Sequence, residues 1–186
     1  MLKNAILDMS AHMDERRQLL KQTKHIILLA LFIALSLSLF MLESMLPLPL
    51  PAPGSKLGLA NLVTVAALYI LGTRDAIVIL ITRVMISSML GGGPTIFMYS
   101  VSGASLSLAV MALLKRTHLF SVIGVSAAGG FAHNVAQTAI AALLIESSSI
   151  FLYLPVLGPL GIATGLLIGI VAGRIISAVT HHQKAV

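Results

Sequence analysis

Residues 25–42 read HIILLALFIALSLSLFML, a continuous apolar stretch without a lysine, arginine, aspartate or glutamate. As a helix this stretch extends about 27 Å, at about 1.5 Å per residue, which is close to the thickness of a bilayer core. The whole chain has 186 residues, of which 58% are hydrophobic and 10% are charged, whereas soluble domains contain about 25% charged residues. The absence of cysteine excludes a disulfide-stapled fold. We therefore expect an all-α integral membrane protein.

Glycines and prolines divide the chain into six apolar segments. The prolines of the stretch 47–53 prevent helix formation after the first segment, and Gly72 and the sequence GGGP at 91–94 interrupt the chain again. The predicted membrane-spanning helices are residues 25–42, 57–72, 75–90, 96–114, 120–145 and a segment within 149–179. The charged residues 1–24 have an amphipathic pattern, which predicts a cytoplasmic helix at the membrane surface. We expect this segment to precede a six-helix transmembrane domain at residues 25–186.

The basic residues predict the orientation of the chain. With the amino terminus in the cytoplasm, Lys56 is the only outer basic residue, and Arg83 lies within the membrane. The other basic residues all fall on the cytoplasmic side: Lys3, Arg16, Arg17, Lys21, Lys24, Arg74, Lys115, Arg116, Arg174 and Lys184. This distribution follows the positive-inside rule. It predicts that both termini lie in the cytoplasm, and it accounts for the net positive charge without nucleic-acid binding. We expect a multi-pass protein of a bacterial plasma membrane.

Small residues recur every fourth position in two of the predicted helices. They are Ala30 and Ala34 in the first helix, and Gly161, Gly165, Gly169 and Gly173 in the last. Small residues at this spacing let two helix backbones approach closely in a membrane. For the glycines this pattern favours packing inside the protein. For the alanines, internal packing and contact with a partner remain alternatives.

Arg83 is the one basic residue predicted at mid-membrane depth. An arginine there costs about 2.5–3.5 kcal/mol on insertion scales, so we expect it to face the protein interior and to have a partner. Two interpretations stay open: a structural arginine bonded to carbonyls or to a carboxylate, and an arginine that binds a ligand. Glu43 and Glu146 are expected near the outer surface, which leaves few carboxylates for an ion pair.

The fifth predicted helix carries three polar side chains on one face. His133 and Gln137 are four residues apart, and Asn134 and Gln137 are three apart. Polar groups at this depth are costly unless they line a cavity or bond one another, so the cluster favours a binding site. The full predicted set is Lys56, Asn61, Arg83, Tyr99, Ser100, His133, Asn134 and Gln137. It is rich in donors and poor in carboxylates, which suits an anionic or polar-headed ligand.

Several kinds of chemistry lack their residues in this chain. There are six acidic residues, and the one adjacent pair, Asp14 and Glu15, lies in the surface segment. No Gly-Lys-Ser/Thr phosphate loop and no aspartate-rich metal motif is present. We therefore expect neither catalysis by this chain alone nor a bound metal or cofactor.

Three strings carry a family resemblance: PGSKLGLANLVTVAALYILG at 53–72, GGGPTIFMYSVSGASLSLAVMALLKR at 91–116, and GGFAHNVAQ at 129–137. They resemble the Gx transporter family, also labelled heptaprenyl diphosphate synthase component I. That family is similar to the substrate-binding S components of energy-coupling factor (ECF) transporters. The resemblance implies a six-helix bundle with an outward-facing ligand cavity. It also implies that Ala30 and Ala34, which match an Ala-x-x-x-Ala pattern, contact a coupling subunit.

These observations lead to one expected function and two rivals. We expect a substrate-specificity subunit of an ECF-type uptake transporter, which binds a vitamin- or precursor-like molecule from outside and depends on a coupling subunit and separate ATPase subunits. The segment 47–56 is then expected to be a lid. The first rival is an accessory membrane subunit of heptaprenyl diphosphate synthesis. The second is a stand-alone secondary transporter, which would need membrane-embedded carboxylates for ion coupling.

Overall fold

The computed structural model describes residues 2–45 and 58–185, and this part of the chain is helical throughout, apart from short turns. The helices are α1 (Leu2–Met45), α2 (Leu59–Ile70), α3 (Thr73–Ser87), α4 (Gly93–Thr117), α5 (Val122–Leu144) and α6 (Leu154–Ala185). A π-helical turn, η1 (Ser88–Gly92), joins α3 to α4, and a 3-10 helix, η2 (Ser148–Tyr153), precedes α6. An all-α fold with six main helices is therefore confirmed. Lys56 and the expected lid at 47–56 lie outside the described residues.

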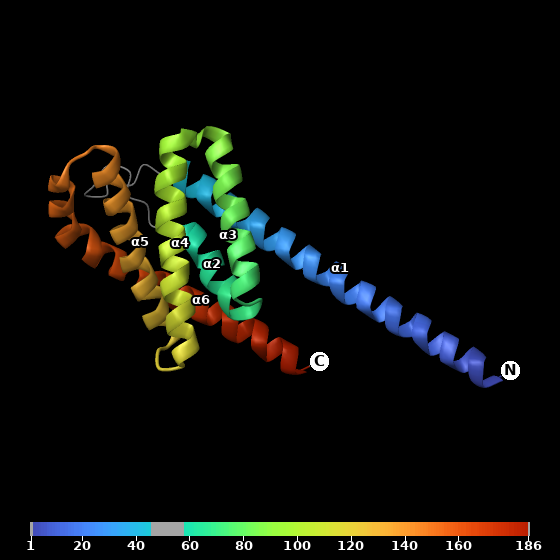
Figure 1. The fold of residues 1–186 in the computed structure, drawn as a ribbon. Coiled ribbons are helices and arrows are strands. Elements are labelled where there is room, and N and C mark those ends of the chain that lie inside the picture. The colour runs from blue at the N-terminus through green and yellow to red at the C-terminus, as the bar shows by residue number, and fades with distance from the viewer. Residues whose placement is uncertain (1, 46–57, 186) are drawn as a thin grey trace.

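The first helix differs from the expectation. It runs without a break from Leu2 to Met45, and no helix end separates residues 1–24 from the apolar stretch. The physical reason is visible in the sequence, because no glycine or proline occurs between residues 2 and 45. The amino-terminal half of α1 projects beyond the other helices (Figure 1), and the described side chains from 12 to 28 are exposed.

The helices alternate in direction (Figure 1). The turns α2–α3 and α4–α5 lie at one end of the bundle, the lower end in the figure, and the connections α3–α4 and α5–α6 lie at the opposite end. Two of the reversals use glycines with positive φ: Gly72 (φ 104°) before α3, and Gly93 (φ 64°), the first residue of α4. Pro94 then occupies the first turn of α4, where its missing N–H costs no hydrogen bond.

Three helical stretches in the described part are long and apolar enough to cross a membrane: His12–Met45, Gly93–Thr117 and Ser148–His181. Helix α5 is long enough but carries His133, Asn134 and Gln137, which lower its hydropathy. Helices α2 and α3 are shorter, with 12 and 15 residues. Exposed leucine, isoleucine and methionine side chains cover much of the outer surface, as expected for contact with lipid.

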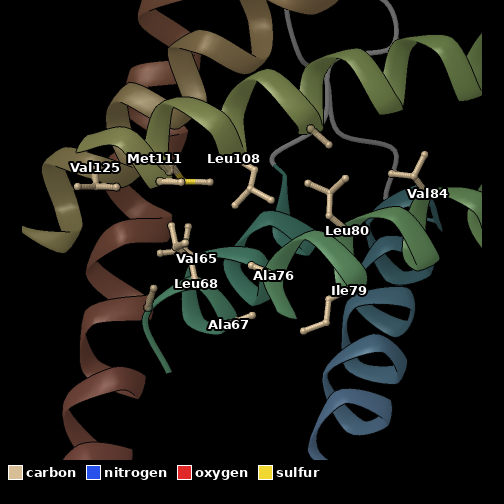
Figure 2. Close-up of a cluster of buried hydrophobic side chains, with 13 residues drawn as sticks. Val65, Ala67, Leu68, Ala76, Ile79, Leu80, Val84, Leu108, Met111 and Val125 are labelled. Carbon is tan, nitrogen blue, oxygen red and sulfur yellow. The ribbon is translucent and has the colours of Figure 1, made fainter. Parts of the chain in front are cut away.

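The hydrophobic core lies where α2, α3 and α4 meet (Figure 2). Leu68 of α2 and Ile79 of α3 are fully buried there, and Leu108 of α4 belongs to the same cluster. Because α2 is buried along most of its length, its seven buried residues form the centre of the bundle.

The glycines of α6 pack against α5. A Cβ atom at Gly161 would lie 2.5 Å from the carbonyl oxygen of Gly130, and one at Gly169 would lie 2.7 Å from the Cα of Ile123. The same holds for Gly165, whose Cβ would lie 2.6 Å from the carbonyl oxygen of Ser126. Internal packing is therefore confirmed for these three glycines. Nothing lies within 4 Å of a Cβ at Gly173.

Candidate functional site

All six helices contribute to one cavity of about 690 Å³. A volume of this size is typical of sites that enclose a small molecule. Seven of the eight sequence-predicted site residues line it: Asn61, Arg83, Tyr99, Ser100, His133, Asn134 and Gln137. The structure thus brings together side chains from α2, α3, α4 and α5 that are up to 76 positions apart in the sequence. Their role in binding stays a prediction.

Arg83 is buried, with 7% of its surface exposed, and it reaches the cavity from α3. Its neighbours on the helix, Leu80 and Val84, are buried in the hydrophobic core and fix this face of α3 toward the interior. Its Nε has no hydrogen-bond partner among the described residues. An unpaired buried polar group costs about 1–3 kcal/mol. Within the described residues this donor is unused, and a ligand-binding role for Arg83 stays a prediction.

Glu43, near the carboxyl-terminal end of α1, also lines the cavity. Only 4% of its surface is exposed, and its carboxylate accepts hydrogen bonds from the backbone N–H of Gly58 (2.5 Å) and of Leu59 (3.0 Å). These are the first N–H groups of α2, and Gly58 has no side chain to cap them. Glu43 supplies that cap from α1. Its negative charge also acts on Arg83, and the two form no direct ion pair.

His133 and Gln137 lie side by side against α4. A Cβ atom at Gly103 would lie 2.9 Å from Cε1 of His133 and 2.9 Å from Cγ of Gln137, so only glycine leaves room for both. The Nδ1 atom of His133 is buried and has no hydrogen-bond partner among the described residues. The prediction that these two residues share one face of the helix is confirmed. Gly103, which leaves room for both side chains, was not predicted from the sequence. A glycine between the serines of a predicted helix was the available signal.

Asn134 has a partner on the protein. Its Nδ2 donates a hydrogen bond to the carbonyl oxygen of Leu157 at 2.5 Å, which joins α5 to the start of α6. The side chain therefore fixes the two helices and also borders the cavity. Asn134 therefore has a structural role. The sequence pattern alone could not distinguish this role from ligand binding.

The rest of the cavity wall is largely apolar. Val65, Met111, Leu160 and Ile168 belong to it, together with small polar residues of which Thr138 is the most buried. Among the described residues, no three histidine, aspartate or glutamate side chains gather as a metal site would require. The arrangement is suited to enclosing a small molecule that has an apolar body and a polar group near Arg83.

A comparison with protein families shows where the chain belongs. The family described as heptaprenyl diphosphate synthase component I matches residues 32–175, and the chain is a member of it. The match covers α2 to α5 completely, together with the cavity and most of α6. Comparison with curated proteins and with solved structures gave no match.

Proposed function

We propose that this family member is the substrate-binding subunit of an ECF-type uptake transporter. It binds a small anionic or polar-headed molecule from the outer side of the membrane. One observation carries the proposal: a cavity of about 690 Å³ between the helices contains two buried nitrogen atoms, Nε of Arg83 and Nδ1 of His133, that have no hydrogen-bond partner within the described residues. Unsatisfied polar groups in a cavity are expected where a ligand completes the hydrogen bonds.

The charge distribution supports six membrane crossings with both termini in the cytoplasm. Arg74 lies beside the α2–α3 turn, and Lys115 and Arg116 lie beside the α4–α5 turn. Those two turns share one end of the bundle, toward which both chain termini also extend (Figure 1). Positive charge therefore gathers at one end, as the positive-inside rule requires of a cytoplasmic face. The short α2 is buried along most of its length and would cross within the protein interior, whereas α3 has one buried face and one apolar exposed face.

The first helix offers a surface for a coupling subunit. Ala30 and Ala34 are exposed, so neither is buried against the other described helices. The neighbouring Leu31 is 61% exposed and Leu35 is 51% exposed. Small residues between larger apolar ones allow a partner helix to approach closely. A coupling subunit at this surface would connect the chain to separate ATPase subunits.

The family name supplies the second candidate, an accessory membrane subunit of heptaprenyl diphosphate synthesis. The largely apolar wall of the cavity favours it, because an isoprenoid chain would fit there. We propose that the chain is not itself the catalyst in either case. Glu43 is the one carboxylate among the described residues that line the cavity, whereas prenyl transfer uses clusters of carboxylates to hold Mg²⁺ and diphosphate.

Purification in mild detergent tests the proposal. Small molecules and proteins that co-purify with the wild-type chain are identified, and the same is done for Arg83→Gln and for the exposed control Arg174→Gln. We expect a coupling subunit and ATPase subunits in all three samples. A retained small molecule should bind Arg83→Gln about ten- to hundredfold more weakly, which corresponds to about 1.5–3 kcal/mol for a hydrogen bond to a charged group. Recovery of a prenyl diphosphate synthase instead would support the second candidate.

Substitution of the α1 surface tests the partner contact separately. Ala30→Leu and Ala34→Leu should reduce co-purification of the coupling subunit and leave ligand binding intact, because both side chains point away from the cavity-lining residues. Leu31→Ala is the matched control, since it removes bulk from the same surface. If both leucine variants retain the coupling subunit at wild-type yield, α1 is not the contact.

A further inference from the structure

The cavity has a simple charge inventory. Among the described residues that line it, Arg83 is the one cation and Glu43 the one carboxylate. Both are more than nine-tenths buried, with exposed fractions of 7% and 4%. Charges in such surroundings interact much more strongly than charges in water. The ligand charge that the site prefers therefore depends on which hydrogen bonds each of these two groups already makes within the protein.

The two groups differ in this respect. Glu43 accepts two backbone hydrogen bonds, one at each carboxylate oxygen, and it faces the amino-terminal end of α2, where the helix dipole favours a negative charge. Arg83 has no comparable partner: its Nε donor is free among the described residues, and Glu43 acts on it only through space. Glu43 is stabilised without Arg83, whereas Arg83 is left with an unused Nε donor.

We infer that the site selects ligands that carry one negative charge, and that Glu43 sets this limit. The inference rests on the proposed binding function. One anionic group placed against Arg83 completes its hydrogen bonds, as a carboxylate does. A second negative charge at the same place meets the buried carboxylate of Glu43, and like charges in a shared site repel strongly. Singly charged amphiphiles are therefore the preferred class, and phosphate monoesters and diphosphates are disfavoured.

Four six-carbon probes with the same alkyl chain test this inference: hexanoate, hexyl phosphate, 1-hexanol and hexylamine. At pH 8 hexanoate carries one negative charge and hexyl phosphate close to two, because the second phosphate pKa is about 6. The chain contains no tryptophan, so Tyr153→Trp at the cavity wall provides a single fluorescent reporter. Leu119→Trp, in the α4–α5 turn and absent from the cavity wall, reports partition into the nanodisc alone. Both are titrated in zwitterionic nanodiscs.

We expect hexanoate to bind at least tenfold more tightly than hexyl phosphate, 1-hexanol or hexylamine. Arg83→Gln should remove the preference for hexanoate over hexanol, and Arg83→Lys should retain part of it. Glu43→Gln keeps one acceptor for the α2 cap and removes the charge, so it should improve hexyl phosphate binding about tenfold. Glu146→Gln, which removes an exposed acid outside the cavity wall, should change nothing.

Three results would overturn the inference. Tighter binding of hexyl phosphate than of hexanoate by the wild type would show that the site accepts a dianion. Equal selectivity of the wild type and a folded Glu43→Gln chain would show that Glu43 does not set the limit. No fluorescence response of Tyr153→Trp to any of the four probes would show that the cavity does not bind this class of ligand. These titrations need only the purified chain, so they are independent of whether a coupling subunit assembles with it.

Discussion

The packing of α6 against α5 can be tested with two identical substitutions on one helix face. Gly169→Ala places a Cβ 2.7 Å from the Cα of Ile123, about 0.7 Å short of ordinary van der Waals contact. Because that neighbour is backbone, no side-chain rotation relieves the contact, and α6 must move away from α5. Gly173→Ala, one turn further along, places its Cβ in open space.

The expected difference follows from this geometry. Both substitutions gain the same helix propensity, about 1 kcal/mol for glycine to alanine, so that contribution cancels in the comparison. Overpacking of a close contact costs about 1–3 kcal/mol, and Gly169→Ala should be less stable than Gly173→Ala by that amount. At roughly 2–4 °C per kcal/mol for a chain of this size, its melting temperature should be lower by at least about 2 °C. Neither residue belongs to the cavity wall, so ligand binding does not complicate the result.

Melting is followed by size-exclusion chromatography of heated samples in one detergent. Gly173→Ala should melt at or above the wild-type temperature. If the two variants melt together, the close approach of α5 and α6 does not contribute to stability and the packing argument is wrong.

Three further predictions concern the site and the topology. Gly103→Ala should weaken hexanoate binding several-fold, because the added Cβ displaces His133 and Gln137. Gly124→Ala is the control, since the nearest contact of its Cβ is at 3.7 Å, and equal binding by the two variants would contradict the proposed geometry. Lys115→Met should lower the free energy of unfolding by about 1–3 kcal/mol relative to the exposed control Arg116→Met. Lys115 donates a 2.6 Å hydrogen bond to the carbonyl oxygen of Leu68, and its Nζ lies 5.0 Å from the centroid of the Tyr69 ring. Coincident melting curves of the two variants would contradict this prediction. In a chain without native cysteine, Ser147→Cys should react with an impermeant reagent in intact cells and Thr117→Cys should not, and labelling of Thr117→Cys would exclude the six-span topology.

The sequence predicted the helices well because their ends are set locally. Gly72 separates α2 from α3, Gly93 begins α4, and the apolar stretches between such positions require helices in a membrane. The shared face of His133 and Gln137 follows from helical spacing in the same way. Such features depend on neighbours in the chain and need no knowledge of the tertiary fold.

Other features depend on contacts between distant residues and could not be predicted. Glu43 precedes a proline-rich stretch, and nothing in its sequence neighbourhood indicates that it is buried. In the structure its carboxylate accepts hydrogen bonds from the first backbone N–H groups of α2, and these contacts hold the side chain in the interior. The hydrogen bond from Asn134 to Leu157 likewise depends on how closely α6 approaches α5. In both cases a side chain satisfies a backbone group of another helix, which no local pattern specifies.

The length of α2 has a consequence for the depth of the binding site. With 12 residues it extends only about 18 Å, whereas a bilayer core is about 30 Å thick. The first turn of α2, with Ala60 and Asn61, borders the cavity. A helix of this length places the polar group of its first turn at the depth of the bilayer core, where a ligand can meet it, and not at the lipid headgroups.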